Sequence, residues 1–499
     1  MAAYSFHQGS ITTINRKLMK TKLLLRKVCL LAVILSIPNF INAQGSRPAP
    51  GPRVPPTALR PDIKIENILH IEPKCLRLVQ NEITGDVWYI AVTGEVYQIK
   101  NIGSKTPTSV KVFTEADHGI KRLQGITIYK NTMFLCGNYT TENGKYNHGR
   151  VVRFDMTNPA KPVMSVVLNT ADYPTNIGSF DHGWDALKVS LDGKYLFINS
   201  GSRTDHGEIQ DKGGIFPNAR IGALTARIFR VPINTKDLVL PDDEAKLKAA
   251  GYIYAEGLRN AFEMNFDGQG NMFAVSNSPD YDMTDDMFWI REGHHYGFPW
   301  YTGGLEMPQQ FADYQPSPDT DPYIPRSGTA WVRKFFNNDP AYPQRPEGLK
   351  FSPGVQNLGP DANEYRGHSG KVMDGDITGA TISGFTPHSC PIGLVFDTKN
   401  VLSPEFRGDG FVLRYSKGGM LGAFTKEGGD LLHLDMAYNK LADNYDMKVT
   451  RIADGFKEPT GALLIKNVLY VLEYGGNNGG DIWKVTLPTT ATKVTASKK

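Results

Sequence analysis

His182 is the residue of this chain whose type and setting most readily suggest catalysis. It follows Asp181, shortly before a predicted strand. An imidazole has an ordinary pKa of about 6.5, close to working pH, and a neighbouring carboxylate can orient it, so His182 could act as a general base. The alternative is a histidine that is hydrogen-bonded within a turn.

Two further pairs of residues could bind an anionic or oxygen-rich ligand. Arg259 and Asn260 place a planar cationic donor next to an amide, which suits a ligand with carboxylate or quinone oxygens. The alternative for this pair is a hydrogen bond between neighbouring sheets. Arg414 and Lys417 bring two cations to one loop. We assign them as contacts to an acidic cofactor, and the alternative is a surface loop.

An oxygen-rich loop follows this Arg-Asn pair in the sequence. Residues 278–282 read Ser-Pro-Asp-Tyr-Asp, and Asp285 and Asp286 come next. Because Ca²⁺ takes about six to eight oxygen ligands, the carbonyls of Ser278 and Pro279, together with the carboxylates, could hold this ion. The spacing differs from that of an EF-hand loop, and the alternative is a solvated acidic turn.

Short strands must position these loops. Residues 262–266 and 271–275 are predicted to pair across the turn Asp267-Gly268-Gln269-Gly270, and residues 287–291 are predicted to form a third strand. Binding residues commonly lie on loops that a rigid sheet supports. The stretch from 251 to 304 is therefore predicted to carry much of the site.

The same phrase of two strands recurs along the chain. Each copy joins an apolar strand to a second strand that ends in a basic or polar residue, with copies starting at residues 85, 131, 193, 270, 408 and 467. This recurrence predicts an all-β fold, a six-bladed β-propeller over residues 66–488, whereas a β-sandwich does not require it. The long interval before residue 408 predicts an insertion at about 300–385. Residues 489–499 are expected to form a flexible tail.

The first 43 residues are predicted to be a signal peptide that starts at Met19. A basic segment runs from Met19 to Lys27, an apolar segment covers residues 28–40, and a small-residue cleavage site ends at Ala43. The alternative, an uncleaved membrane anchor, needs about 20 apolar residues. Residues 44–65 are rich in Pro, Gly, Arg and Ala, which predicts a disordered lead-in. We therefore expect an exported protein, periplasmic or secreted, with no membrane span in the mature chain.

Charge and cysteine content exclude several classes of protein. Residues 1–43 hold six of the 55 Lys and Arg side chains and no Asp or Glu, which leaves 49 basic against 51 acidic side chains in the mature chain. This balance gives no support to nucleic-acid binding. Cys75, Cys136 and Cys390 permit at most one disulfide and argue against a cysteine-based zinc site.

Taken together, these segments resemble the glucose/sorbosone dehydrogenase family. The motif GLRN at 257–260, with GxxYGxPW downstream at 293–300, is the most specific part of the resemblance. Weaker matches are the run from Asp181 to Phe197, HSCPIGLVF at 388–396, PEFRGDGFV at 404–412 and the closing motifs between 455 and 485. They occur in the family's order over roughly residues 70–487.

The resemblance implies a six-bladed propeller that holds pyrroloquinoline quinone and Ca²⁺ at one end of its channel. It implies oxidation of an aldose sugar or a related alcohol, with electrons passed to an external acceptor. By position, His182 is the general base for the anomeric hydroxyl while hydride passes to the quinone. Arg259 and Asn260 contact quinone and substrate, and Ser278 and Pro279 give backbone carbonyls to Ca²⁺.

Two other functions compete with this one. A propeller that binds carbohydrate or protein without catalysis needs neither His182 nor Arg259. A hydrolase or lactonase on a calcium propeller predicts acidic ligands that converge on the axis. The family carries a Gly-Asp pair after the second strand where this chain has Gly201-Ser202, and Asp205 is the carboxylate that could replace the aspartate.

Overall fold

The computed structural model describes residues 54–175, 181–209, 220–279, 282–315, 317, 319, 339–361, 364–366, 371–375, 382–416 and 427–489. The chain divides into the unit Met1–Val54, of which only Val54 is described, and the unit Pro55–Lys499. The predicted signal peptide and almost all of the predicted tail lie outside the described residues. Within these residues, no helix is long and apolar enough to cross a membrane.

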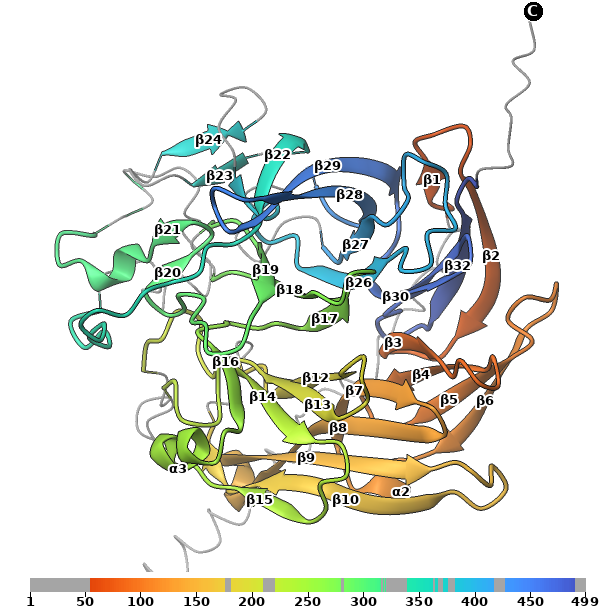
Figure 1. The fold of residues 1–499 in the computed structure, drawn as a ribbon, viewed down its shortest axis with the longest axis horizontal. Helices are drawn as coiled ribbons and strands as arrows, with labels where there is room; N and C mark the ends of the chain where they lie inside the picture. Colours follow the sequence, from red (N-terminus) through yellow and green to blue (C-terminus); the bar gives the residue numbers. More distant parts are fainter. Residues whose placement is uncertain are drawn as a thin grey trace, which may run out of the picture. The chain divides into compact units, whose positions relative to one another are not determined.

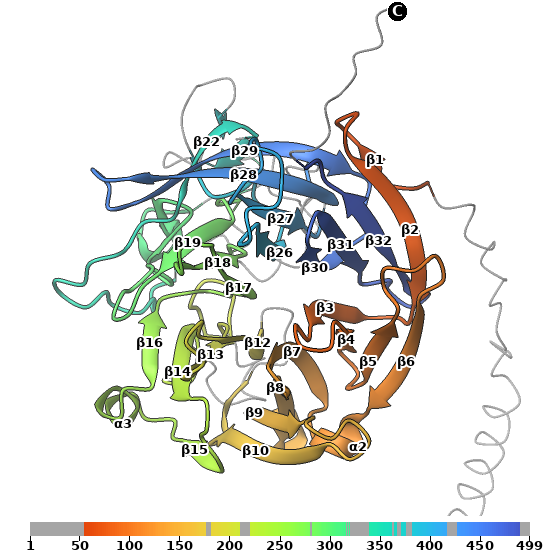
Figure 2. The same cartoon turned by 45° about the vertical axis from the view of Figure 1, so that its right-hand side comes forward.

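The unit from Pro55 onward is a six-bladed β-propeller, which confirms the predicted fold class (Figures 1 and 2). The first sheet contains β3 (Cys75–Gln80), β4 (Val87–Ala91), β5 (Val96–Lys100) and β6 (Thr108–Phe113). The second contains β7 (Arg122–Tyr129), β8 (Thr132–Thr141), β9 (Tyr146–Asp155) and β10 (Val163–Thr170), to which β15 (Leu238–Leu240) and β11 (Tyr173–Pro174) are added. The third contains β12 (Trp184–Val189), β13 (Tyr195–Ser200), β14 (Arg227–Pro232) and β16 (Ile253–Glu256).

The second half of the chain supplies the remaining sheets. The fourth contains β17 (Glu263–Phe266), β18 (Met272–Ser276) and β19 (Asp286–Ile290). The fifth contains β26 (Pro391–Phe396), β27 (Gly410–Arg414), β28 (Asp430–Asn439) and β29 (Asn444–Asp454), extended by β22 (Gln356–Pro360) and β25 (Ile382–Ser383). The sixth contains β30 (Pro459–Ile465), β31 (Val468–Glu473), β32 (Gly480–Thr486) and β2 (Lys64–Ile71).

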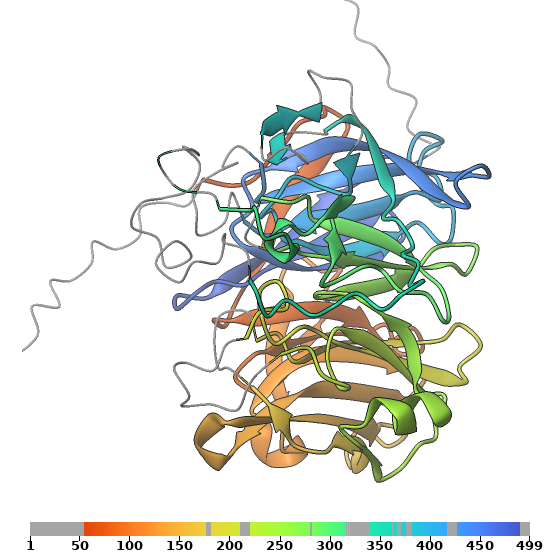
Figure 3. The same cartoon turned by 90° about the vertical axis from the view of Figure 1, so that its left-hand side faces the viewer.

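Strand β2 closes the ring, because it pairs antiparallel with β32 near the other end of the chain, with Ile65 opposite Val485. Figure 3 shows the sheets from the side, with the orange and yellow first half of the chain beside the green and blue second half. The two ends of the chain thus share one sheet, and the edges of β2 and β32 that face each other are paired.

The repeated phrase corresponds to the second and third strands of each sheet, from β4 and β5 in the first to β31 and β32 in the sixth. The second strands β4, β18 and β27 are buried along their whole length. A neighbouring sheet covers each face, so these strands are continuous apolar runs rather than alternating ones. Separate hydrophobic clusters fill the contacts between neighbouring sheets; Leu76 and Met133, for example, lie in the cluster between the first and second.

Helical segments are short and lie in connections. Within the described residues they are α2 (Glu115–His118), α3 (Glu244–Ala249) and the 3₁₀ turns η1 (Glu142–Gly144) and η2 (Pro308–Gln310). Two small hairpins, β20 (Tyr301–Thr302) with β21 (Leu305–Glu306) and β23 (Glu364–Arg366) with β24 (Val372–Asp374), lie in the predicted insertion. That stretch also supplies β22, which extends the fifth sheet by pairing in parallel with β29.

The fold begins earlier than the predicted residue 66. Strand β1 (Thr57–Ala58), within the predicted disordered lead-in, pairs with β29, and β2 begins at Lys64. The apolar side chain of Ile63 is buried in the core between the fifth and sixth sheets, which gives this segment a reason to be ordered.

Candidate active site

Three segments from distant parts of the sequence lie side by side at one end of the inner strands. The main-chain N–H of Gly201 donates to the carbonyl of Gly183 at 2.8 Å, and that of Ser202 donates to the carbonyl of Arg259 at 2.7 Å. The main-chain N–H of His182 donates to the carbonyl of Ser202 at 3.1 Å. The start of β12, the end of β13 and the segment before β17 therefore bring His182 next to the Arg-Asn pair.

His182 is held in a form that suits a base. Its Nδ1 lies 3.2 Å from the carbonyl oxygen of Ser202, which can only accept, so Nδ1 carries the proton and Nε2 keeps its lone pair. Burial, followed by the nearby charge of Arg259, lowers the pKa of His182 to about 3. Arg122 donates to the carbonyl of His182 and, at 2.9 Å, to that of Asp181, which fixes the main chain beneath the ring.

Asn260 lies close to His182 and carries a hydrogen-bond acceptor that is unsatisfied. Its Nδ2 donates to Oδ1 of Asn277 at 3.1 Å, whereas its own Oδ1 is buried without a hydrogen-bond partner among the described residues. A Cβ placed on Gly201 would lie 2.5 Å from Cβ of His182 and 2.8 Å from Oδ1 of Asn260. Gly201 therefore packs between the side chains of His182 and Asn260, and only glycine fits there.

Arg259 lies behind Asn260 in an ion pair that is almost completely buried. Its Nη2 donates to Oδ1 of Asp205 at 3.0 Å, its Nε to the Asp205 carbonyl at 2.8 Å, and its Nη1 to the Asn277 carbonyl at 3.2 Å. The exposed fractions of the two charged side chains are 3% and 1%. Asp205, the carboxylate that the sequence suggested near Ser202, is thus the partner of Arg259.

Asp205 also bonds to His206, whose Nδ1 lies 2.9 Å from Oδ2 of Asp205. Burial lowers the pKa of His206, but the carboxylates of Glu208 and Asp205 outweigh that effect and raise the pKa above its usual value. Glu208 accepts from the main-chain N–H groups of Asp205 and His206, and the hydroxyl of Tyr342 donates to the His206 carbonyl at 2.6 Å. The loop that supports Arg259 is therefore rigid.

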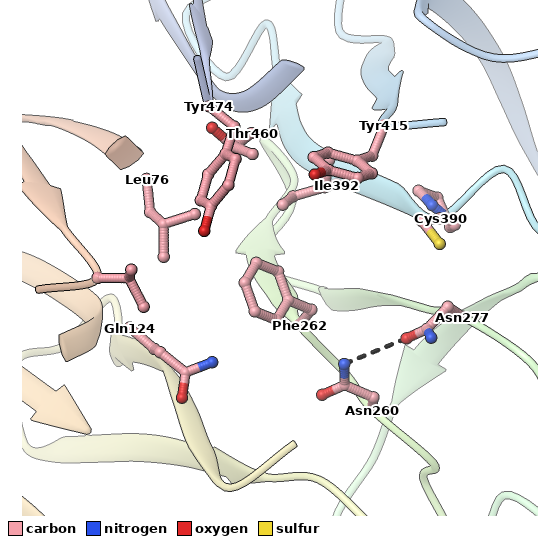
Figure 4. A pocket seen from close by; sticks show the side chains of 12 residues that line it. Leu76, Gln124, Asn260, Phe262, Asn277, Cys390, Ile392, Tyr415, Thr460 and Tyr474 are labelled. Atoms are coloured by element: carbon pink, nitrogen blue, oxygen red, sulfur yellow. Dashed lines mark hydrogen bonds between the residues drawn. The ribbon is translucent and has the colours of Figure 1, made fainter. Parts of the chain in front are cut away.

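A cavity of about 270 Å³ lies at this end of the propeller (Figure 4). Inner strands of several sheets supply part of its wall, through Leu76, Gln124, Ile392 and Thr460, so the cavity surrounds the propeller axis. Among the residues that the structure describes, the lining consists of neutral side chains: Leu76, Val92, Gln124, Asn260, Phe262, Asn277, Cys390, Pro391, Ile392, Tyr415, Thr460 and Tyr474.

The wall of this cavity combines flat apolar surfaces with hydrogen-bonding groups. Tyr415 and Tyr474 meet edge to face, with ring centroids 6.4 Å apart, and Phe262 lies opposite them in Figure 4. Asn260 and Asn277 stand together at the side of the cavity, joined by their hydrogen bond. Such a wall suits a flat ring system and several hydroxyl or carbonyl groups of a ligand.

The acidic loop has its carboxylates engaged by protein groups. Asp285 accepts from the Ser278 main-chain N–H at 2.8 Å and from that of Cys390 at 2.7 Å, and Asp286 accepts from the Ser383 hydroxyl at 2.9 Å. Burial raises the pKa of Asp285, and it raises that of Asp286 to about 7. The loop is therefore a buried hydrogen-bonded turn, and the solvated turn considered from the sequence is wrong for this part of it.

Asp282 is equally committed. Its carboxylate oxygens lie 2.5 Å from Nη2 of Arg366 and 2.7 Å from Nε2 of His388, and all three side chains are buried. No group of three or more His, Cys, Asp or Glu side chains could hold a metal ion in the part of the chain that the structure describes. The calcium contacts of Ser278 and Pro279 concern main-chain carbonyls and stay a prediction; both residues are buried beside the cavity residue Asn277.

Arg414 lies apart from the cavity. Its fully buried guanidinium donates to Asp430 at 2.6 Å and to Glu427 at 2.9 Å, and its Nη1 lies 2.9 Å from Oδ2 of Asp361 in an ion pair. The next residue, Tyr415, lines the cavity, and alternate side chains of a strand point in opposite directions. These contacts indicate a structural ion cluster and give no support to a cofactor contact. Lys417, its predicted companion, lies outside the described residues.

Several residues of the site carry no signal in the sequence. Gln124 and Thr460 lie on inner strands, and Tyr415 and Tyr474 directly follow second strands; all four look like ordinary strand positions. Their role becomes visible only once the ring is closed. His206 and Glu208 could have been noticed as a charged pair close to Asp205.

The fold and this site define a β-propeller with an axial cavity that Asn260 lines and a neutral histidine close to Asn260. A family model described as glucose/sorbosone dehydrogenase matches residues 73–332, just over half of the chain. The chain belongs to this family, and it is a sugar oxidoreductase. The matched residues include His182, Arg259 and the acidic loop.

Solved structures with the same fold include the soluble aldose sugar dehydrogenase of Escherichia coli in its apo form. It is 15% identical, with a TM-score of 0.52, and the match covers 85% of this chain and 99% of that one. The pyranose dehydrogenase PQQ domain of Coprinopsis cinerea is 12% identical, with a TM-score of 0.50 and coverage of 88% and 99%. At these identities the likeness shows the fold. Among curated proteins, none matches the chain.

Proposed function

We propose that this protein oxidises an aldose sugar with pyrroloquinoline quinone as its cofactor and His182 as its general base. The observation that carries the proposal is the pair of acceptors on either side of Gly201. Nε2 of His182 is unprotonated, and Oδ1 of Asn260 is buried without a partner among the described residues. Two acceptors on side chains that lie close together suit two hydroxyl groups of a sugar, because each hydroxyl can donate one hydrogen bond.

The aromatic part of the same wall suits the flat rings of a bound quinone. A buried acceptor without a partner carries a free-energy cost of about 1–3 kcal/mol until a ligand supplies a donor. Asn260 is in that state, and the flat rings of Phe262, Tyr415 and Tyr474 suit a planar cofactor. When bound, pyrroloquinoline quinone supplies the acceptor for the hydride that leaves the sugar carbon.

The protein residues then have separate tasks. His182 takes the proton of the anomeric hydroxyl at Nε2, while its Nδ1–H remains bonded to Ser202. Asn260 orients the substrate through Oδ1. Arg259 keeps Asn260 in place, and its positive charge helps to keep His182 unprotonated before the sugar binds. Loss of a proton and a hydride converts the hemiacetal to a lactone.

Calcium belongs to the proposal as a ligand of main-chain carbonyls. The carboxylates of Asp282, Asp285 and Asp286 already have protein partners, so Ser278 and Pro279 would hold the ion through their carbonyl oxygens. A site of this kind is weaker than one built from carboxylates, because Ca²⁺ affinity rises with the number of charged ligands.

We propose further that the protein is exported and gives its electrons to an external acceptor. The support is the basic and apolar pattern of residues 19–43. N-terminal sequencing of the protein recovered outside the cytoplasm tests this point. A chain that begins near Gln44 supports export, and a chain that retains Met1 and stays in the cytoplasm contradicts it.

Reconstitution tests the proposed activity. The mature protein is loaded with pyrroloquinoline quinone with and without Ca²⁺, and aldose-dependent reduction of a dye is followed together with lactone formation. We expect sugar-dependent reduction that is stronger with Ca²⁺. Protein that binds sugars without reducing the dye indicates a binding propeller, and hydrolysis of added lactone without oxidation indicates a lactonase.

A further inference from the structure

The inner strands of the first three sheets are interrupted at equivalent places. The pairing register shifts between Leu76 and Val79 in β3, between Leu123 and Gly125 in β7, and between Trp184 and Ala186 in β12. A bulge of this kind withdraws main-chain groups from the ladder and bends the strand. In the second and third sheets, the bulge leaves a main-chain carbonyl outside the ladder, that of Gln124 in β7 and that of Asp185 in β12.

One side chain satisfies these carbonyls. Arg77 lies in the β3 bulge with a φ of 60°, a conformation that ordinary side chains rarely adopt. Its Nε donates to the carbonyl of Gln124 at 3.1 Å, and its Nη2 donates to that of Asp185 at 2.8 Å. Gln124 and Asp185 are the bulged residues of the second and third sheets.

The same guanidinium also holds the fourth sheet. Its Nη2 donates to the Phe262 carbonyl at 2.5 Å, its Nη1 lies 2.5 Å from Oε2 of Glu263, and its carbon lies 4.1 Å from the centre of the Phe262 ring. The sixth sheet packs closely against the main chain of Arg77, since a Cβ on Gly461 would lie 3.0 Å from it. Arg77 is 5% exposed.

The residues that Arg77 contacts lie close in the sequence to the two acceptor residues of the site, His182 and Asn260. Asp185 follows His182 by three residues, and Phe262 follows Asn260 by two. The guanidinium bonds to both downstream residues at once, so it sets how far apart the starts of β12 and β17 lie. Phe262 and Gln124 also form part of the cavity wall.

We propose that Arg77 is a positioning residue that fixes His182 and Asn260 relative to each other from beneath the cavity. This inference rests on the proposed function for its effect on catalysis, but not for its effect on the geometry of His182. An arginine suits the task because its planar fork offers several donors in fixed directions, whereas a lysine has one compact ammonium group.

Three variants test the inference. Arg77→Lys keeps a cation opposite Glu263 but loses the fork. Arg77→Met combined with Glu263→Gln removes both charges, so that no carboxylate is left uncompensated. Arg153→Met is the matched control, because Arg153 lies on the third strand β9, away from the cavity lining, and donates at 3.0 Å to the Ile233 carbonyl beyond the next sheet's β14.

Two measurements are made on each variant. The first is kcat and KM for the aldose in the reconstituted enzyme, and the second is the ring-nitrogen NMR signal of His182 in cofactor-free protein, assigned by comparison with His182→Ala. We expect kcat/KM to fall at least about ten-fold in both Arg77 variants, since small displacements of reacting groups have effects of this size. We also expect the His182 signal to shift in both, and Arg153→Met to leave both readouts unchanged while lowering Tm.

The results distinguish a positioning role of Arg77 from a purely structural one. Folded Arg77 variants with wild-type kcat/KM and an unmoved His182 signal overturn the inference and leave Arg77 a purely structural residue. If the double variant does not fold, Arg77→Lys decides alone by the same criteria. If the wild-type enzyme oxidises no sugar, the proposed function fails, and the His182 signal then supports or overturns the positioning role by itself.

Discussion

A single histidine shows how its surroundings set what it can do. An exposed imidazole is partly protonated near neutral pH, but burial and Arg259 lower the pKa of His182 to about 3. The Ser202 carbonyl selects the tautomer with the proton on Nδ1. The residue is therefore unprotonated at Nε2 over a wide pH range.

This leads to an expected pH profile. Because His182 stays unprotonated down to a pH of about 3, kcat/KM should show no fall with an inflection near 6.5 as the pH is lowered. The profile is measured between pH 8 and pH 4.5, with the free energy of unfolding measured alongside to exclude denaturation. An acid limb centred near the ordinary histidine pKa contradicts a His182 that is kept neutral.

The same shift has a consequence for stability. The unfolded chain binds a proton at this position between the ordinary pKa of 6.5 and the folded pKa of about 3, and the folded chain does not. The contribution of His182 to stability is therefore present above pH 6.5 and is lost as the pH falls toward 3. We expect the slope of unfolding free energy against pH in that window to be smaller in His182→Gln, by urea unfolding. An unchanged slope contradicts the depressed pKa.

The buried pair of Arg259 and Asp205 is expected to matter for stability as well as activity. Asp205→Asn leaves a buried guanidinium without its carboxylate, which should cost about 3 kcal/mol of unfolding free energy. The control is Glu292→Gln, which removes an exposed partner of Arg230 and should cost at most about 1 kcal/mol. Equal costs in urea unfolding contradict a special role for the buried pair.

At the scale of elements, the site depends on how closely three segments approach. Gly201 lies between His182 and Asn260, and a Cβ there would meet both. We expect Gly201→Ala to lower kcat/KM at least about ten-fold through displacement of the two acceptors. Gly268→Ala is the control, since its added Cβ meets nothing closer than 3.6 Å. A Gly201→Ala enzyme with normal kcat/KM contradicts the close approach.

The elements also show what the sequence could predict. The six strand phrases are visible because second strands are buried on both faces and end at recognisable turns. His182 and Arg259 lie shortly before strands that the sequence predicts, so their types and positions indicate a site. Arg77 and Gln124 did not, because their role comes from bulges and from the closure of the ring, which bring the first four sheets onto one guanidinium.

Charge alone was a poor guide to function. Arg414 was expected to contact a cofactor, but its side chain lies among three carboxylates, whereas the next residue, Tyr415, lines the cavity. Asp282 and Asp285 were expected to serve calcium, and both are used to fold the loop that carries them. A buried charge needs a partner, and spacing along the chain does not reveal which partner it has.

At the scale of the whole molecule, the site exists only in a closed ring. The cavity takes its wall from inner strands of both halves of the chain, and β2 completes the sixth sheet beside β32. Deletion of residues 1–72 removes β2 and the buried side chains of Ile63 and Ile71. We expect this deletion to lower Tm by at least about 5 °C or to abolish folding. Deletion of residues 1–53, the control, should leave Tm unchanged; equal effects contradict ring closure by β2.

The measurement that tests the central claim most directly compares wild type with His182→Ala in one assay. Both are loaded with pyrroloquinoline quinone, quinone binding is verified by absorbance, and aldose-dependent dye reduction is followed. We expect both proteins to bind the quinone, and kcat to fall at least about a hundred-fold in His182→Ala, the size of effect typical of a general base. Full activity in His182→Ala, or a wild type that binds the quinone and oxidises no aldose, contradicts the claim.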